Sequence, residues 1–328
     1  MKTLVTGATG FIGSHVVDIL RQTDTEIICT ARPSSDLRWL EGKDITIINA
    51  SLNNPESLIP AVRDVDMIIH VAGLTAARND KEFLIGNRDA TKHLLDTAST
   101  YAPRLERFLH VSSQTVTGPS QSLSLPVHEN SPLQPITAYG RSKKAAEEVV
   151  QTYSDRMPIT IVRPPAVYGE RDTAILTFFQ SVSKGIVPLI GFDDKRVSLI
   201  HGIDLARGIV EAANNSNTIG QTYFVSSEEF YSWKQIAEIT KDAFGKSFVL
   251  PIRVPHGLVM TLAGLSEIFG RFSTKPPVLN FEKGKDLIQP YWICSVEKAK
   301  KDFGWKQSIS IEEGIEQTVR WYIDNKWV

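Results

Sequence analysis

A glycine-rich turn near the N-terminus is the feature that most constrains the fold of this chain. A short β-branched run, Lys2 to Thr6, leads directly into glycines at positions 7, 10 and 13, and an apolar stretch of helical length follows. Glycine lacks a Cβ, so the backbone can turn tightly, approach a phosphate closely and let the helix pack on its strand. The free amides at a helix N-terminus attract an anion. The pattern predicts a strand, a phosphate-binding turn and a helix, with a ligand-free tight turn as the alternative.

The first half of the chain alternates short strand-like runs with stretches of helical length. The predicted strands cover Lys2 to Thr6, Glu26 to Thr30, Ile45 to Asn49, Met67 to Val71, Phe108 to Val111 and Ile159 to Val162. The predicted helices cover Gly13 to Gln22, Leu58 to Val62, Asn87 to Ser99 and Ser142 to Tyr153. Apolar strands that alternate with helices indicate a parallel sheet covered on both faces. We therefore predict an α/β fold, a doubly wound, Rossmann-like parallel sheet.

Beyond about residue 165 the pattern becomes less regular, with several prolines and no new run of strand-helix repeats. We predict a dinucleotide-binding domain over residues 1–165 and a smaller, mainly substrate-binding cap over residues 166–328. The strand-like segment Gly220 to Ser226 is a candidate to return to the main sheet, so residues 198–228 are candidates to rejoin the first domain. The apolar stretch Leu258 to Phe272 predicts a cap helix, with peripheral membrane contact or a dimer face as alternatives.

Charge and cysteine content narrow the class of partner. The chain has 36 basic and 37 acidic residues, so no overall field draws it to nucleic acid or to an anionic membrane. The two cysteines, Cys29 and Cys294, are far apart in sequence, which favours a reducing compartment. The N-terminus lacks the apolar core of a signal peptide, and no apolar stretch is long enough to span a bilayer. We expect a cytoplasmic protein that acts on a small molecule.

The end of the second predicted strand bears on the type of dinucleotide. After Ala31 the chain carries Arg32, Ser34 and Ser35. An acidic side chain at this point would bind both ribose hydroxyls and repel a 2′-phosphate, whereas an arginine binds that phosphate. We therefore expect NADP in preference to NAD. In the alternative, Arg32 stacks on the adenine or lies in solvent, and Asp36 binds the ribose.

A second group of residues predicts proton transfer. Tyr139 and Lys143 are four residues apart on a predicted helix and share one face. A tyrosine with a pKa of about 10 is a poor base, and a lysine cation with a positively charged nicotinamide would lower that pKa. Ser113 follows a predicted strand, at the end where parallel sheets bind ligands, and its hydroxyl is suited to bind a substrate oxygen. Tyrosine and lysine at this spacing also occur by chance, so the combination with Ser113 carries the prediction.

Together these motifs resemble the extended short-chain dehydrogenase/reductase family, of the NAD-dependent epimerase/dehydratase type, over nearly the whole chain. The matching segments are TGATGFIG at 6–13, HVAG at 70–73, Asn87, VSSQTVTG at 111–118, YGRSK at 139–143, RPPAVYGE at 163–170 and the run from Val296 to Trp305. The resemblance implies that Tyr139 exchanges a proton with an alcohol or ketone oxygen, that Ser113 orients this oxygen, and that a hydride passes between its carbon and the nicotinamide. It also implies that Asn87 holds the helix and Lys143 in place.

The predicted binding residues follow from the turn, the strand ends and this resemblance. The predicted cofactor contacts are Gly7, Thr9, Gly10, Phe11, Ile12, Gly13, Arg32, Ser34, Ser51, Leu52, Val71, Ala72, Gly73, Tyr139, Lys143, Pro165 and Val167. The predicted substrate contacts are Ser113, Gln114, Tyr168 and Arg196. No metal site is predicted, because His70, His110 and His201 lie in or beside strands without the spacing of metal ligands.

Three departures from relatives narrow the chemistry. Sugar-nucleotide 4,6-dehydratases carry Thr-Asp-Glu where this chain has Ser113, Gln114 and Thr115, and elimination of water needs that acid and base, so dehydration is disfavoured. Nucleotide-sugar epimerases usually carry an asparagine at the position of Ala166 and an arginine at that of Val197, although Arg196 lies one residue away. The segment from 163 to 170 looks closer to 3β-hydroxysteroid dehydrogenases and dihydroflavonol reductases, whose substrates are apolar.

Three functions therefore stay open at the level of sequence. The first is an NADP- or NAD-dependent oxidoreductase that interconverts an alcohol and a ketone on a partly apolar substrate. The second is a nucleotide-sugar epimerase, which would use the same residues to oxidise C4 transiently. The third is a non-catalytic dinucleotide-binding sensor or scaffold, and the presence of all three catalytic positions argues against it. A homodimer is expected by resemblance only.

Overall fold

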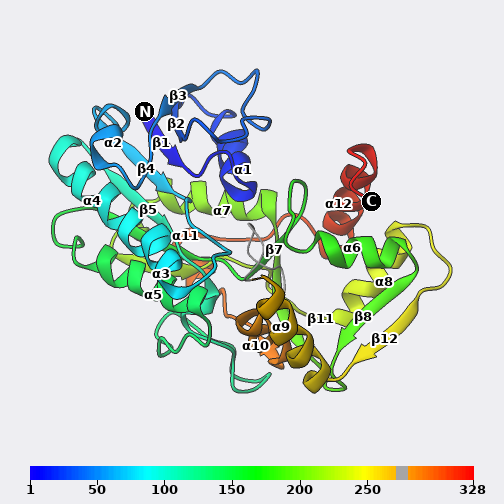
Figure 1. Cartoon of the computed structure of the whole chain (residues 1–328). Coiled ribbons are helices and arrows are strands. Elements are labelled where there is room, and N and C mark those ends of the chain that lie inside the picture. Colours follow the sequence, from blue (N-terminus) through cyan, green and yellow to red (C-terminus); the bar gives the residue numbers. More distant parts are fainter. Residues whose placement is uncertain (271–279) are drawn as a thin grey trace.

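A seven-stranded parallel sheet forms the N-terminal part of the protein in the computed structural model, which describes residues 1–270 and 280–328 (Figure 1). The strand order is β10-β6-β5-β4-β1-β2-β3. The strands are β1 (Lys2–Thr6), β2 (Glu26–Ala31), β3 (Thr46–Asn49), β4 (Met67–His70), β5 (Arg107–Val111), β6 (Ile159–Arg163) and β10 (Gln221–Phe224). The predicted doubly wound α/β fold is confirmed, and the six predicted strands are each present within about one residue at either end.

Both faces of this sheet are buried, because successive strand residues pack into different cores. In β1, Leu4 belongs to one core and Val5 to the other, and Ile68 and Ile69 of β4 repeat this alternation. The helices over the first core are α2 (Pro55–Val62), α4 (Ala90–Tyr101) and α5 (Ala138–Gln151), and those over the second are α1 (Phe11–Leu20) and α7 (Gly202–Asn214). A parallel strand that is covered on both sides needs this continuous apolar sequence.

All four predicted helices are present with shifted bounds. Helix α1 begins and ends two residues earlier than predicted, and α2 begins three residues earlier. The expected helix from Asn87 begins earlier, as α3 (Asp80–Phe83) and a π-helical turn η1 (Leu84–Asp89) that runs into α4. Helix α5 begins at Ala138, four residues before the predicted start, because the Thr137 hydroxyl caps it by accepting a hydrogen bond from the Gly140 amide at 3.1 Å. This earlier start places Tyr139 inside the first helical turn.

The second part of the protein contains more regular structure than the sequence predicted. Its strands are β7 (Ala166–Tyr168), β8 (Ile186–Ile190), β9 (Arg196–His201), β11 (Phe230–Ser232), β12 (Leu250–Val254) and β13 (Tyr291–Trp292), with helices α6 (Leu176–Ser183), α8 (Trp233–Ala243) and α12 (Ile311–Asp324). The parallel pairing of β10 with β6 confirms the predicted return of the segment from Gly220 to Ser226 to the main sheet. The expectation of no new strand-helix alternation was wrong, because β9, α7 and β10 follow one another. Strand β12 is exposed along most of its length, so it lacks the apolar run that marks a core strand.

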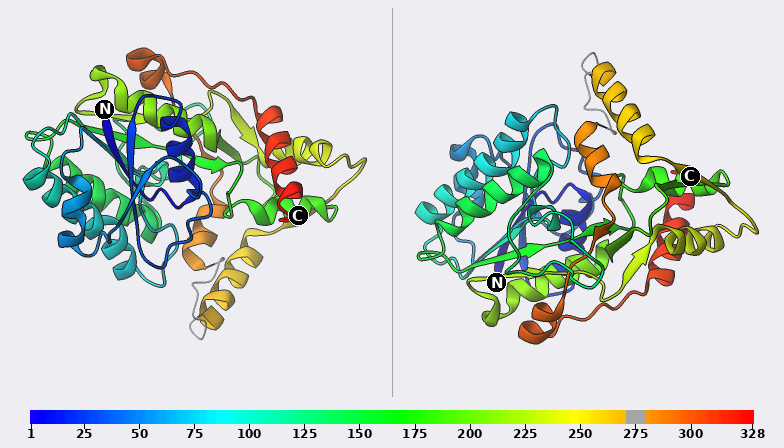
Figure 2. Two further views of the ribbon diagram at one scale, coloured as in Figure 1. Left: turned by 90° about the horizontal axis from the view of Figure 1, so that it is seen from above. Right: turned by 90° about the horizontal axis from the view of Figure 1, so that it is seen from below.

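Helices α9 (His256–Gly270) and α10 (Phe281–Ile288) form a pair, in which α9 projects from the molecule and α10 lies between α9 and the body (Figure 2). They pack closely at Gly284, where an added Cβ would lie 3.0 Å from the Met260 sulfur. Helix α9 covers most of the predicted cap helix, whose residues 271 and 272 lie outside the described residues. Within the described parts of the chain, no helix combines the length and the apolar character needed to cross a bilayer.

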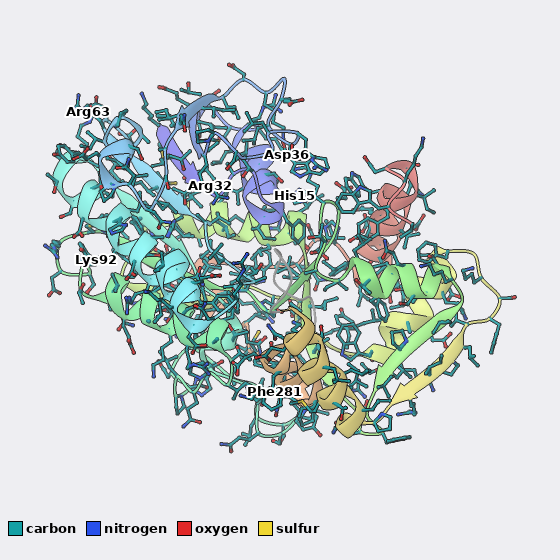
Figure 3. All side chains as sticks on the ribbon, in the orientation of Figure 1. His15, Arg32, Asp36, Arg63, Lys92 and Phe281 are labelled. Carbon is teal, nitrogen blue, oxygen red and sulfur yellow. The ribbon has the colours of Figure 1, made fainter. Side chains whose placement is uncertain are left out.

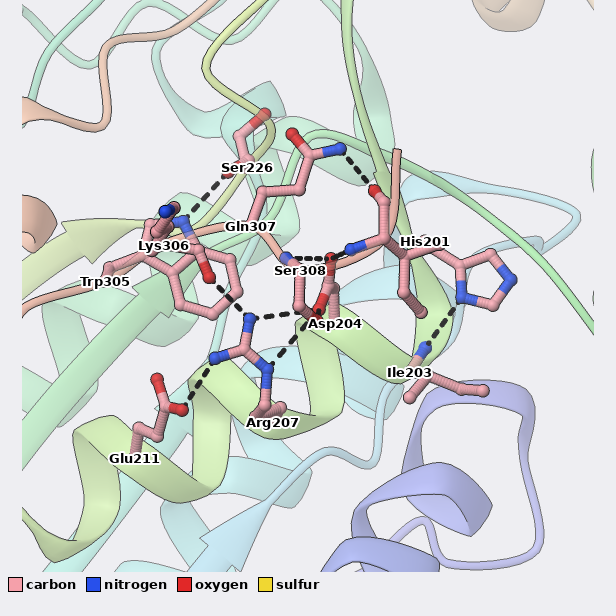
Figure 4. Close-up of polar contacts among 11 residues, drawn as sticks. His201, Ile203, Asp204, Arg207, Glu211, Ser226, Trp305, Lys306, Gln307 and Ser308 are labelled. Carbon is pink, nitrogen blue, oxygen red and sulfur yellow. Dashed lines mark hydrogen bonds and ion pairs between the residues drawn. The ribbon is translucent and has the colours of Figure 1, made fainter. Parts of the chain in front are cut away.

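The C-terminal segment returns to the N-terminal part through α11 (Glu297–Phe303). Trp305 is buried against α7, and its indole nitrogen donates a hydrogen bond to the Ser226 carbonyl at 2.9 Å. The same segment is bonded to Asp204 and Arg207 of α7 (Figure 4). Helix α7 therefore contacts both α1 on the sheet and the irregular segment that leads into α12.

Candidate active site

The glycine turn after β1 leaves no room for side chains at two of its three glycines. Gly7 has a φ of +73°, and a Cβ there would lie 2.6 Å from the amide nitrogen of Ala72. A Cβ on Gly13 would overlap the Gly7 carbonyl oxygen. The Gly10 amide closes the turn by donating to the Gly7 carbonyl at 3.0 Å. Backbone atoms therefore occupy the space that a Cβ would need at Gly7 and Gly13, so both positions require glycine.

The start of α1 fits the diphosphate of a dinucleotide. Gly10 is its N-cap, and among the described residues no side chain caps the helix and no acid lies in its first turn. Thr9 precedes this cap, and Phe11 and Ile12 are the first residues of the helix. Because the first amides of a helix have no acceptor within it, they are available to an anion. Residues 71 to 73 follow β4 directly beside Gly7, so the predicted cofactor residues of these two segments share one site.

The loop after β2 places Arg32 at the surface. The Arg32 amide donates to the Ser35 hydroxyl at 3.1 Å, and the Ser35 amide donates to the Arg32 carbonyl at 2.9 Å. Arg32 and Asp36 both lie in this exposed loop beside α1 (Figure 3). Among the described residues the Arg32 guanidinium has no ion-pair partner, whereas the carboxylate of Asp36 is paired with Arg38. Ser51 and Leu52 follow β3, the neighbouring strand, and Ser34 is exposed.

Ser113 and Tyr139 meet at the carboxyl end of β5. Ser113 is 8% exposed, and its hydroxyl oxygen accepts hydrogen bonds from the Thr115 amide at 3.2 Å and the Thr115 hydroxyl at 3.0 Å. Burial raises the pKa of Tyr139 to about 12, while its hydrogen bond with Ser113 acts in the opposite direction. The sequence predicted a lowered pKa for this tyrosine. In the protein alone the pKa is raised, because loss of hydration disfavours the phenolate more than its neighbours stabilise it.

Lys143 lies one helical turn after Tyr139 on α5 and is 3% exposed. Its ammonium donates a hydrogen bond to the Val111 carbonyl at 2.8 Å. Burial lowers the pKa of Lys143 to about 8, and the charge of Glu147 opposes this effect. Gly73 borders the lysine, since a Cβ added there would lie 3.7 Å from its Nζ. The lysine is thus held between β5, the segment after β4 and its own helix.

Asn87 connects three segments around the site. Its amide nitrogen donates to the Ser142 hydroxyl at 2.8 Å and to the Leu74 carbonyl at 3.0 Å, and its oxygen accepts from the Leu74 amide at 2.7 Å. The Ser142 hydroxyl in turn donates to the Tyr139 carbonyl at 2.7 Å. Asn87 is 1% exposed, so it contacts the helix of Tyr139 and Lys143 from within the protein.

The remaining predicted residues have mixed positions. Gln114 is buried beside Ser113, in the short helix η2 (Gln114–Val116), and within the described chain its Nε2 has no hydrogen-bond partner. Tyr168 is 3% exposed and packs edge-on against His201, so the structure does not bring it to the surface of the site. Arg196 is paired with Asp194 at 2.8 Å and contacts Gln235 at 3.2 Å. Pro165 and Val167 are half-buried, immediately before and within β7.

Two contacts on helix α5 were not predicted. Helix α10 packs against the start of α5, where a carboxylate oxygen of Glu282 accepts a hydrogen bond from the Ala138 amide at 2.5 Å. Asp286, one turn further along α10, raises the pKa of Tyr139, and its own pKa is raised by burial to about 6. No local sequence signal joins residues so far apart. The Thr137 cap, by contrast, has the spacing of an N-cap and was available to sequence analysis.

Comparison with known proteins identifies the family of this chain. The family model described as "NAD dependent epimerase/dehydratase family" matches residues 3–238. A ceramide reductase of Caulobacter vibrioides is 27% identical over 99% of this chain and 95% of its own length. The crystal structure of DesIV, a dTDP-glucose 4,6-dehydratase from Streptomyces venezuelae with NAD and TYD bound, superposes with a TM-score of 0.81 at 23% identity, over 99% of this chain and 98% of the other. UDP-glucuronic acid 4-epimerase from Bacillus cereus, in complex with NAD, gives 0.79 at 21% identity over 100% of both chains.

The family match extends from β1 through α5 and into α8, and so includes every strand of the main sheet. Its members are dehydrogenases, reductases and epimerases that use a nicotinamide dinucleotide and act on small molecules. The chain is therefore an enzyme of the NAD dependent epimerase/dehydratase family.

Proposed function

We propose that this enzyme is an NAD(P)-dependent reductase that interconverts a ketone and a secondary alcohol, with Tyr139 as the general acid and base. The observation that carries the proposal is the meeting of Ser113, Tyr139 and Lys143 beside the glycine turn. The two residues that follow Ser113 in sequence have an amide and a hydroxyl side chain, and neither has a carboxylate. The dinucleotide supplies or accepts the hydride when bound. Ser113 and Tyr139 hold the reacting oxygen, and Tyr139 transfers its proton.

The side chains next to Ser113 disfavour dehydration. Elimination of water needs one group that removes a proton from carbon and another that protonates the departing hydroxyl. Gln114 and Thr115 occupy these positions, and neither an amide nor a hydroxyl titrates in the required range. The Thr115 hydroxyl is instead bonded to Ser113, which helps to fix the Ser113 oxygen.

The segment expected to bind a nucleotide diphosphate disfavours epimerisation. Ala166 carries no polar side chain, and Val197 is 6% exposed within the core of the second part. Arg196, the cation one residue away, is paired with Asp194. A diphosphate would have to compete with that carboxylate for the arginine. These features support a substrate without a nucleotide.

The loop after β2 supports NADP as the preferred cofactor. Arg32 is exposed beside the ribose end of the predicted site, and Asp36 is already engaged by Arg38. We expect Arg32→Ala to weaken NADPH binding by about tenfold or more, the value of one charge-assisted hydrogen bond, and to leave NADH binding unchanged. Equal losses for both cofactors, or none, would contradict the preference.

The decisive experiment mixes the purified enzyme with NADPH or NADH and a series of ketones of increasing alkyl length, and follows loss of absorbance of the reduced cofactor. Net oxidation in proportion to alcohol formed supports the reductase. In parallel, UDP- and dTDP-sugars are incubated with the NAD-loaded enzyme and the sugars are separated. Conversion of a sugar to its epimer with no net change in cofactor would show the epimerase and overturn the proposal.

A further inference from the structure

A buried histidine links β1, the strand before the glycine turn, to the π-helical turn that carries Asn87. His70 is the last residue of β4 and is fully buried. Its Nδ1 lies 2.7 Å from the hydroxyl of Thr6, the residue before Gly7, and its Nε2 lies 2.9 Å from the hydroxyl of Thr91 on α4. Both ring nitrogens are therefore bonded to hydroxyl groups, each of which has one proton to donate.

The direction of these hydrogen bonds follows from the last one in the chain. The Thr91 hydroxyl lies 2.6 Å from the Asn87 carbonyl, and a carbonyl only accepts, so the single Thr91 proton is donated there. Thr91 must then accept from His70, which places the ring proton on Nε2. Nδ1 of His70 is left to accept from the Thr6 hydroxyl. Burial, followed by the nearby charge of Lys143, lowers the pKa of His70 to about 3, so the ring carries one proton only.

The chain of bonds continues from Asn87 to the catalytic helix. The carbonyl that Thr91 binds belongs to the same residue whose amide donates to Ser142, and Ser142 donates to the Tyr139 carbonyl. Asn87 lies within η1, and π-helical turns are frequent at functional sites because the extra residue re-aims the side chains around it. A sequence of directed hydrogen bonds therefore leads from β1 to the backbone of Tyr139.

We propose that His70 and Thr91 are positioning residues that fix Asn87, and through it the helix of Tyr139 and Lys143, relative to the dinucleotide strand β1. The role of the pair in turnover rests on the function proposed above. Neither residue touches the reacting atoms. Loss of the Thr91 hydroxyl would leave the His70 ring nitrogen without its acceptor. It would also remove the side-chain bond to the Asn87 carbonyl, which would keep its backbone bond from the Ala90 amide, so η1 would be held less firmly.

Substitutions on α4 test whether these hydrogen bonds contribute to catalysis. Thr91→Val removes the hydroxyl and keeps the shape of the side chain, and Thr91→Ser restores the hydroxyl. Thr97→Val is the matched control, because Thr97 is also buried on α4 and also donates to the carbonyl four residues earlier, that of His93, at 2.7 Å. We expect Thr91→Val to lower kcat about tenfold or more while the cofactor KM changes less than about twofold, since misplacement by a fraction of an ångström is enough.

Thr91→Ser should recover most of this loss, and Thr97→Val should match the wild-type kcat. Equal kcat values for the two valine variants would overturn the catalytic part of the proposal. A rise in cofactor KM that accounted for the whole loss of activity would also overturn it, because the hydrogen bonds of His70 and Thr91 would then serve cofactor binding alone.

Nitrogen NMR of the ¹⁵N-labelled full chain tests the hydrogen-bond chain without any substrate, with His70→Gln used to assign the ring signals. We expect a neutral His70 with its proton on Nε2 from about pH 5 to about pH 9, far above its lowered pKa. A proton on Nδ1, or a ring that titrates in this range, would overturn the directed chain even if turnover were normal. If the wild type turned over no ketone, the proposed function would fail, but this spectrum would still test the direction of the hydrogen bonds around His70.

Discussion

Tyr139 and Lys143 share one buried environment, but burial shifts their pKa values in opposite directions. It raises the pKa of Tyr139 to about 12 and lowers that of Lys143 to about 8, because in each case the charged form loses hydration. Tyr139 is therefore fully protonated at neutral pH and ready to donate to a ketone oxygen. Lys143 is still a cation at that pH, and in the function proposed above its charge would stabilise the phenolate that the donation creates.

Ketone reduction should consequently slow above about pH 8, with kcat/KM falling about tenfold per pH unit as Lys143 loses its proton. The measurement is kcat/KM for the ketone from about pH 6 to about pH 10. Lys144→Ala is the control, since this neighbouring lysine on α5 binds the Leu133 carbonyl away from the site and should leave the profile unchanged. A wild-type profile that stays flat to about pH 10 would contradict the assigned role of Lys143.

Removing the Tyr139 hydroxyl should abolish proton transfer and leave the fold intact. We expect Tyr139→Phe to lower kcat by about 100- to 10,000-fold, the usual contribution of a general acid. Cofactor affinity measured by fluorescence should change little, because the glycine turn is untouched. Tyr153→Phe is the matched variant, as it removes a hydroxyl bonded to Asp96 just beyond the same helix. Full turnover by Tyr139→Phe on every ketone accepted would refute its role.

At the scale of single residues, the sequence predicted those whose positions follow from a strand end or a helical spacing. Ser113 follows β5, and Tyr139 and Lys143 share a face of α5, so the structure brings them together as the pattern indicated. Tyr168 lies in the predicted segment 163–170 but its side chain is buried, because it packs into the core of the second part of the protein. Glu282 and Asp286 reach the site from a distant helix, which no local pattern encodes.

At the scale of elements, the glycine turn makes a prediction with a matched control inside the same domain. Gly7 and Gly42 have nearly equal φ values, +73° and +70°, but a Cβ on Gly7 would collide with the backbone of Ala72 whereas Gly42 has open space around it. Gly42→Ala should therefore lose only about 1 kcal/mol of stability, from the left-handed backbone. Gly7→Ala adds the collision, so it should lose more stability and at least about tenfold in NADPH affinity.

Thermal unfolding and cofactor titration of the two variants check this difference. Gly42→Ala should bind NADPH as the wild type does. Similar affinities for both variants would show that the turn accommodates a side chain and that its glycines serve another purpose.

Elements with continuous apolar sequence were predictable, and the others were not. β1, β4 and β5 are buried on both faces, so their runs of apolar residues mark them. The π-helical turn η1 has no such pattern, because its insertion depends on contacts with Leu74 and α5. Strands β8 and β12 of the second part are largely exposed, which removes the signal that identified the first six, whereas β9 is buried.

At the scale of the whole molecule, α7 joins the sheet to the C-terminal segment. A side-chain oxygen of Asp204 accepts hydrogen bonds from the amides of Ser308 and Ile309 at 3.0 and 2.9 Å, and the other accepts from the Ser308 hydroxyl at 2.6 Å and from Arg207 at 3.0 Å. The C-terminal motif indicated the family, but the sequence alone did not indicate that this segment returns to α7. Packing of Trp305 against Gly208 beside these bonds makes the return specific.

This buried carboxylate should make stability depend on acid pH. Burial alone would raise the pKa of Asp204, but the hydrogen bonds from Ser308, Ile309 and Arg207 outweigh it and hold the pKa below its usual value. A carboxyl whose folded pKa is lowered stabilises the fold above its unfolded pKa, near 4, and this contribution is lost as pH falls towards the folded value. Asp204→Asn should therefore lower the free energy of unfolding at neutral pH by about 2 to 4 kcal/mol, because an amide cannot accept at both former oxygen positions.

Denaturant unfolding from about pH 7 down to about pH 3 separates this effect from general acid sensitivity. The gap in stability between wild type and Asp204→Asn should narrow as the pH falls below about 4, because the wild type then loses the charge that the variant never had. Asp242→Asn, a change of the same chemistry at an exposed carboxylate paired with Lys241, should stay close to the wild type throughout. A gap that is constant with pH would mean that the substitution acts through packing, and that the charge of Asp204 does not hold the C-terminal segment to α7.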